Sequence, residues 1–175
     1  MNNKTETATL NKIWSLQIDT ILPILAFSIP FLLSGPQLIT GTIVNTFLFI
    51  ASAKQINQRH LYLIALLPSL GAVSHGILFG QFTSYLLFFI PSIWLGNMVL
   101  ILSFNKLKTA LAFPFSIILP SIFKTTVLYL SALVFTGIHL VPTIFISSMG
   151  AVQIFTSMMG GTAAYVFYKI GKRKI

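Results

Sequence analysis

The segment TSYLLFFIPSIWLGNMVLILSF, residues 83–104, contains no charged side chain. A helix needs about 20 mainly apolar residues to cross the hydrocarbon core of a bilayer, so this segment predicts a transmembrane helix. Lys106 and Lys108 follow it, and a second long apolar run then occupies residues 111–136. Four more apolar runs occupy residues 18–34, 38–53, 61–79 and 144–168. We therefore expect an all-α polytopic membrane protein, a bundle of six transmembrane helices.

The composition of the whole chain favours the same fold class. The mean hydropathy is +0.90, and 55% of the residues are apolar while only 7% are charged. Soluble domains carry about 25% charged residues. The segments between the apolar runs are too short for a soluble domain, so residues 18–170 are expected to form a single transmembrane domain. Residues 1–17 would be a polar cytoplasmic segment and residues 171–175 a basic cytoplasmic tail.

Positive charges lie in alternate gaps between the apolar runs, and only Lys124 departs from this pattern. The gaps that hold Lys or Arg contain Lys4, Lys12, Lys54, Arg59, Lys106, Lys108, Lys169, Lys172, Arg173 and Lys174. Lys and Arg are retained on the cytoplasmic side during insertion, so both termini are predicted to face the cytoplasm of a bacterial cell, across its inner membrane. This topology and attraction to anionic membrane lipids explain the net charge of +9 without a nucleic-acid partner.

Polar side chains from several of the predicted helices fall at nearly one depth. At a rise of about 1.5 Å per residue, Asn45 and Lys124 lie almost at the bilayer centre. Asn97 lies slightly toward the cytoplasm and Gln153 slightly toward the outside. His75 falls in the outer half and Gln37 at the outer mouth. The candidate ligand-binding residues are therefore Lys124, Asn45, Gln153, Asn97, His75 and Gln37.

Lys124 is the most informative of these residues. A cation at the bilayer centre costs ~2.5–3.5 kcal/mol on insertion scales, so it is expected to face the protein interior and to have a partner. The chain has only two acidic residues, Glu6 in the N-terminal segment and Asp19 at the cytoplasmic edge. Amide oxygens accept from an ammonium but do not neutralise it. The sequence therefore predicts a pocket for a small anionic or amphipathic solute, and it favours one with a carboxylate.

Several of these residues also have purely structural interpretations. In such an interpretation, the side chain of Lys124 would extend to a membrane–water interface, as long cationic side chains do. Alternatively, its ammonium would hydrogen-bond to the carbonyls that Pro91 and Pro120 leave without a donor. His75 would hydrogen-bond within the bundle rather than line a pocket. Asn97, which follows Gly96, would cap a broken helix rather than contact a solute.

Catalytic and metal-binding functions lack the residues that they need. Hydrolases and transferases of the membrane use paired carboxylates, a Ser–His pair or an acidic metal-binding motif. The chain has no Cys and only three dispersed His, so no metal site and no cofactor are expected. The glycine-rich phosphate loop of an ATPase is also missing, and ATP-driven transport would need a separate subunit. We expect a protein that is not an enzyme.

Several short motifs resemble, in their order along residues 18–170, a small group of membrane proteins similar to the substrate-binding (S) components of energy-coupling factor transporters. The motifs are Gly35-Pro36-Gln37-Leu38-Ile39-Thr40-Gly41 with Val44-Asn45, Ile90-Pro91 with Gly96-Asn97, Phe123-Lys124 with Tyr129-Leu130-Ser131, and Gln153-Ile154-Phe155-Thr156 with Gly160-Gly161 and Ala164-Tyr165. The resemblance implies a subunit that captures a vitamin-like micronutrient. A transmembrane coupling protein and two cytoplasmic ATPases would energise it.

Two departures from the S-component pattern bear on this resemblance. S components often present an Ala-x-x-x-Ala face on the first helix, whereas here Ala26 is followed four residues later by Pro30. The metal-uptake branch carries an N-terminal His motif, and Met1-Asn2-Asn3 lacks it, which disfavours nickel or cobalt as the solute. Two alternatives stay open at this point. One is a non-transporting membrane scaffold, and the other is a self-contained secondary carrier.

Overall fold

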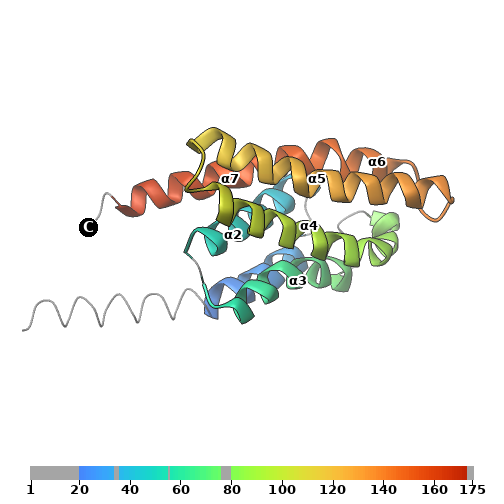
Figure 1. Cartoon of the computed structure of the whole chain (residues 1–175). Coiled ribbons are helices and arrows are strands. Elements are labelled where there is room, and N and C mark those ends of the chain that lie inside the picture. The colour runs from blue at the N-terminus through green and yellow to red at the C-terminus, as the bar shows by residue number, and fades with distance from the viewer. Residues whose placement is uncertain (1–19, 34–35, 55, 76–79, 173–175) are drawn as a thin grey trace, which may run out of the picture.

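The computed structural model describes residues 20–33, 36–54, 56–75 and 80–172 of the chain, and every regular element in these ranges is a helix. An N-terminal helix covers Thr20–Leu32. It is followed by α2 (Gln37–Lys54), α3 (Gln58–His75), the short 3₁₀ helix η1 (Gly80–Tyr85), α4 (Leu86–Leu107), α5 (Phe113–Gly137), α6 (Ile144–Met149) and α7 (Ala151–Lys172). The expected all-α class is thus confirmed, with the long helices side by side in a bundle (Figure 1).

Among the described residues, three helical stretches are long and apolar enough to cross a membrane. They are Phe82–Leu107, Phe113–Gly137 and Ile144–Ile170. The N-terminal helix is shorter, and α2 and α3 have 18 residues each but carry more polar side chains. In α2 these polar groups face protein, because Thr40, Asn45 and Ser52 are all buried. The expected segment 1–17 lies outside the described residues, and of the expected tail 171–175 the first two residues belong to α7 while residues 173–175 lie outside the described part.

The sixth apolar run, expected as one helix over 144–168, is divided into α6 and α7 at Gly150. The backbone of Gly150 has φ −99° and ψ −97°, which interrupts the helix. A Cβ atom at Gly150 would lie 2.8 Å from the carbonyl oxygen of Ile146 and 2.9 Å from Cδ2 of Tyr129. A residue without a side chain therefore fits best so close to Tyr129 of α5 and to the last turn of α6.

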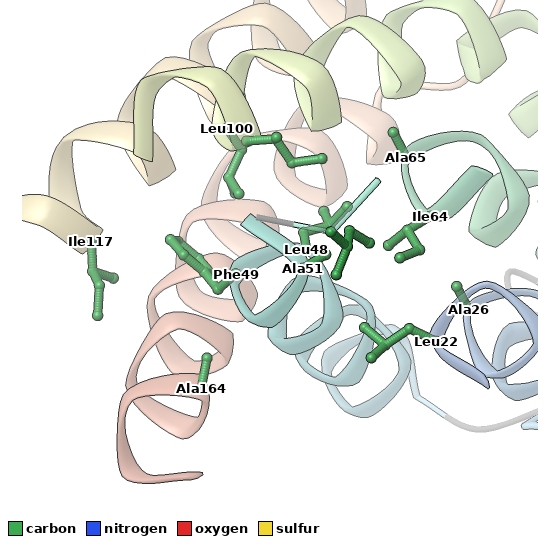
Figure 2. Close-up of a cluster of buried hydrophobic side chains, with 12 residues drawn as sticks. Leu22, Ala26, Leu48, Phe49, Ala51, Ile64, Ala65, Leu100, Ile117 and Ala164 are labelled. Atoms are coloured by element: carbon green, nitrogen blue, oxygen red, sulfur yellow. The ribbon is translucent and has the colours of Figure 1, made fainter. Parts of the chain in front are cut away.

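Two apolar clusters fill the bundle. In the first, Leu22 and Ala26 of the N-terminal helix lie at one side, and Ile117 of α5 and Ala164 of α7 lie at the other (Figure 2). The second contains Leu86, Phe89, Leu128, Ala132, Val141, Phe145 and Met149. Phe89 and Phe145 stack there with ring centroids 5.1 Å apart. Members of the second cluster also form part of the wall of a small cavity between the helices, which contains the candidate site.

Candidate functional site

A cavity of about 80 Å³ lies inside the bundle, and five of the six predicted site residues line it. These are Gln37 and Asn45 of α2, Asn97 of α4, Lys124 of α5 and Gln153 of α7. The depths estimated from the helical rise along separate apolar runs therefore identified side chains that line one cavity in the structure. The sixth, His75, is the last residue of α3, and its side chain lies outside what the structure describes.

The ammonium of Lys124 lies in the interior of the protein, with only 3% of the residue exposed. Its Nζ donates a hydrogen bond of 2.6 Å to Oδ1 of Asn45. The interpretation that Lys124 extends to an interface is therefore wrong, and its recorded acceptor is an amide rather than a carbonyl freed by a proline. Both acidic residues of the chain, Glu6 and Asp19, lie outside the described residues. The described part of the chain thus offers Lys124 no carboxylate.

Asn45 is held in place by a short chain of hydrogen bonds that runs from α5 through α2 to α7. Its Nδ2 donates to Oγ1 of Thr156 over 3.2 Å, and that hydroxyl donates to the carbonyl of Gln153 over 3.1 Å. The amide of Asn45 is thereby oriented with its oxygen toward Lys124. Because every member of this series of hydrogen bonds is neutral except Lys124, the described residues hydrogen-bond the positive charge but do not compensate it.

Close helix packing fixes the position of Asn45. A Cβ atom on Gly160 of α7 would lie 2.6 Å from Cβ of Asn45 and 2.8 Å from the backbone nitrogen of Thr46. Small residues at helix interfaces let two backbones approach in this way. On the other side of the site, a Cβ atom on Gly96 of α4 would lie 3.4 Å from Cγ of Lys124, which is an ordinary van der Waals contact. The close approach at Asn45 therefore requires a residue without a side chain at Gly160 of α7 but not at Gly96 of α4.

Two polar atoms at the cavity have no hydrogen-bond partner in the described part of the chain. Asn97 donates from Nδ2 to the carbonyl of Ala65 over 2.7 Å, but its buried Oδ1 is unpaired. The buried Oγ1 of Thr40 is unpaired as well. A buried polar group without a partner costs free energy, so these atoms are suited to a ligand or to water. Asn97 lies within the continuous helix α4, and the interpretation that it caps a broken helix is wrong.

Gln37 connects two elements at the end of the cavity opposite to the basic helix ends. Its Nε2 donates to the carbonyl of Ser148 over 3.2 Å, which ties the start of α2 to α6. Both Gln37 and Gln153 are half-buried, unlike Asn45, Asn97 and Lys124. The two glutamines therefore border the site, whereas the other three form its interior.

Thr40 and Thr156 belong to the site but were not predicted as site residues. Each lies three residues along its helix from a predicted residue, Thr40 from Gln37 and Thr156 from Gln153, and residues at this spacing share a helix face. This spacing was the signal that would have found them. The arrangement as a whole offers one ammonium, amide groups and hydroxyls, which are groups that bind an anion with hydrogen-bonding substituents.

Comparison of the chain with protein-family models, with curated proteins and with solved structures finds no match in any of the three.

Proposed function

We propose that this chain is a six-span protein of a bacterial inner membrane that captures a short carboxylate solute. It would take the solute from the outer side and pass it to an ATP-driven importer of the energy-coupling factor type. The observation that carries the proposal is the buried ammonium of Lys124, which lines this cavity and has, among the described residues, a neutral amide as its hydrogen-bond acceptor. Removing a charge from water costs several kcal/mol unless it is paired. A bound carboxylate would compensate the positive charge of Lys124.

The membrane arrangement rests on the sequence together with the helices. The three long apolar helices supply three spans, and the N-terminal helix, α2 and α3 would supply the others. The basic residues in alternate gaps favour a topology with both termini in the cytoplasm. The outer face is then the side of Gln37, where the cavity meets α6.

The size of the cavity narrows the class of solute. A buried water needs roughly 10–15 Å³ of such space, so about 80 Å³ holds several waters or a solute of a few heavy atoms. Pockets that enclose drug-sized ligands measure about 300–1,000 Å³. The unpaired Oδ1 of Asn97 and the unpaired hydroxyl of Thr40 favour a solute that also carries O–H or N–H groups. A short hydroxy acid or amino acid fits these features better than a full-sized vitamin.

A membrane scaffold is the main rival, and one observation favours it. The hydrogen bonds from Lys124 through Asn45 to Thr156 join α5, α2 and α7, as a purely structural polar layer would. No small solute would stabilise such a scaffold against unfolding. A self-contained secondary carrier would bind the same solute but would move it across liposome membranes without ATPase subunits.

Thermal unfolding of the detergent-purified protein tests the proposal. The protein would be heated with a set of short hydroxy acids and amino acids and, in parallel, with their uncharged amides. A ligand at about 100 times its Kd adds ~2.7 kcal/mol of stability, so an acid that binds should raise the midpoint while its amide should not. Lys124→Met should abolish the shift, and Lys169→Met, which removes an exposed charge of α7, should preserve it. The proposal fails if no acid shifts the midpoint or if Lys124→Met responds like the wild type.

A further inference from the structure

A second and larger cavity, of about 410 Å³, lies at the basic end of the bundle. It is enclosed by α2, α4, α5 and α7, at the end where α2, α4 and α7 terminate and α5 begins. This is the end of the bundle at which Figure 1 marks the C-terminus. Its volume falls within the ~300–1,000 Å³ that is usual for ligand pockets. The solute site proposed above does not include it.

The walls of this second cavity are mainly aromatic and aliphatic. Phe49 of α2 and Phe104 of α4 meet edge to face with centroids 5.0 Å apart. Phe113 and Tyr165 form another aromatic pair, with centroids 3.6 Å apart, across α5 and α7. Gly161 also lines the cavity, and a Cβ atom there would be 2.5 Å from Cγ2 of Ile117. The lining of the cavity is therefore mainly apolar and suits a hydrocarbon chain.

One cation lies at the rim of this apolar space. The Nζ of Lys108 donates to the carbonyl of Ser52 over 2.9 Å and to Oδ1 of Asn105 over 2.8 Å. Burial lowers the pKa of Lys108, and the nearby phenol of Tyr168 acts in the opposite direction. None of these neighbours carries a carboxylate. The described residues thus combine an apolar slot with an uncompensated positive charge at its mouth.

We propose that the second cavity binds one acyl chain of an anionic membrane lipid, whose headgroup lies against Lys108 and Tyr168. Charge complementarity identifies the occupant, because an apolar slot alone would accept any hydrocarbon but a cation at its mouth selects an anionic headgroup. Basic pockets between transmembrane helices on the cytoplasmic side bind anionic headgroups in this way. Tyrosine is enriched at the same membrane level, where its hydroxyl meets the headgroups.

Native mass spectrometry of the protein with phosphatidylglycerol or phosphatidylcholine as the probe lipid tests this site. The wild type should retain one phosphatidylglycerol and bind it more tightly than phosphatidylcholine by about fivefold, the factor expected for one lysine at ~1 kcal/mol. Lys108→Gln should remove that preference, and Lys108→Arg should keep it. Lys106→Gln is the matched control, because it removes an exposed charge from the same segment and should leave the preference unchanged.

A second variant tests the apolar slot without touching the charge. Ala53 lines the cavity and is half-buried, so Ala53→Leu should fill part of the slot and weaken retention of both lipids. Lys124→Met should leave lipid binding as in the wild type, which separates this proposal from the solute site. Equal retention of the two lipids by the wild type would overturn the proposal, as would equal behaviour of Lys108→Gln and Lys106→Gln. If neither lipid is retained, the slot serves some other apolar occupant and the proposal is wrong.

Discussion

At the scale of single residues, the contact between Lys124 and Asn45 determines how the site should respond to substitution. The ammonium of Lys124 donates a hydrogen bond of 2.6 Å to the neutral Oδ1 of Asn45 in the interior of the bundle. Replacing buried ionic groups by well-packed apolar residues is often neutral or stabilising, whereas removing a single partner is costly. If Lys124 serves to bind a ligand, its side chain should therefore lower the free energy of unfolding of the ligand-free protein.

Lys124→Met should raise the free energy of unfolding of the ligand-free protein, or leave it unchanged. The gain expected for an apolar replacement is up to about 4 kcal/mol, and it is offset by about 1–3 kcal/mol because Oδ1 of Asn45 loses its donor. Unfolding by denaturant in detergent measures it, and Lys169→Met should shift the value by no more than about 0.5 kcal/mol because its site is exposed. A clear loss of stability in Lys124→Met would instead support the scaffold, in which the lysine holds the helices together.

Two substitutions of Asn45 should change stability in opposite directions. Asn45→Asp places a carboxylate where the amide oxygen now accepts from Lys124, so the two charges compensate each other and the melting temperature should rise. Asn45→Ala leaves the ammonium without its acceptor, which should cost roughly 3–5 kcal/mol. Thermal unfolding in detergent should give the order Asp above wild type above Ala. If Asp is the least stable of the three, Lys124 is already compensated and our account is wrong.

At the scale of helices, α2 and α7 pack so closely that one added methyl group between them should push the two helices apart. Gly160→Ala would put a Cβ atom 2.8 Å from the backbone nitrogen of Thr46, and backbone atoms cannot move aside as a flexible side chain can. Overpacking of this kind costs about 1–3 kcal/mol. Gly137→Ala is the control, because a Cβ atom at Gly137 meets nothing within 4 Å. Equal unfolding free energies of the two variants would contradict the packing described here.

The sequence predicted the helices well and their interruptions poorly. Apolar runs locate helices because each run must be buried or face lipid, and the regular rise along a helix gives depth. The rotation of a helix about its axis depends on packing. The sequence therefore placed Asn45, Asn97 and Lys124 at one level but did not show which atom of Asn97 would be left unpaired. The break at Gly150 falls at a glycine, which is a weak local signal, because most glycines of the chain lie inside helices that continue through them.

The two cavities show the same distinction between local and tertiary information. Five predicted residues line the first cavity because they share a depth and because helix packing turned them inward. The second cavity is lined jointly by residues of α2, α4, α5 and α7. Such a lining arises only in the assembled bundle, so no single run of the sequence predicts it.

At the scale of the whole molecule, the proposed orientation can be tested with introduced cysteines, since the chain has none of its own. Leu33→Cys and Ile138→Cys should react with a membrane-impermeant maleimide on intact cells, because both positions are exposed at the predicted outer side. Lys54→Cys and Ala110→Cys, also exposed, should react only after the cells are permeabilised. The wild type gives the background. Labelling of Ala110→Cys in intact cells would overturn the orientation with both termini inside.

The central claim is that the charge of Lys124 is compensated by a captured acid. Native mass spectrometry tests it most directly, with wild type and Asn45→Asp purified gently and in parallel from the same cells. Our account predicts that the wild type carries one small acidic molecule, whose mass identifies it, and that Asn45→Asp carries none because its own carboxylate takes that place. A wild type without any such molecule, or the same molecule retained by both proteins, would contradict the account.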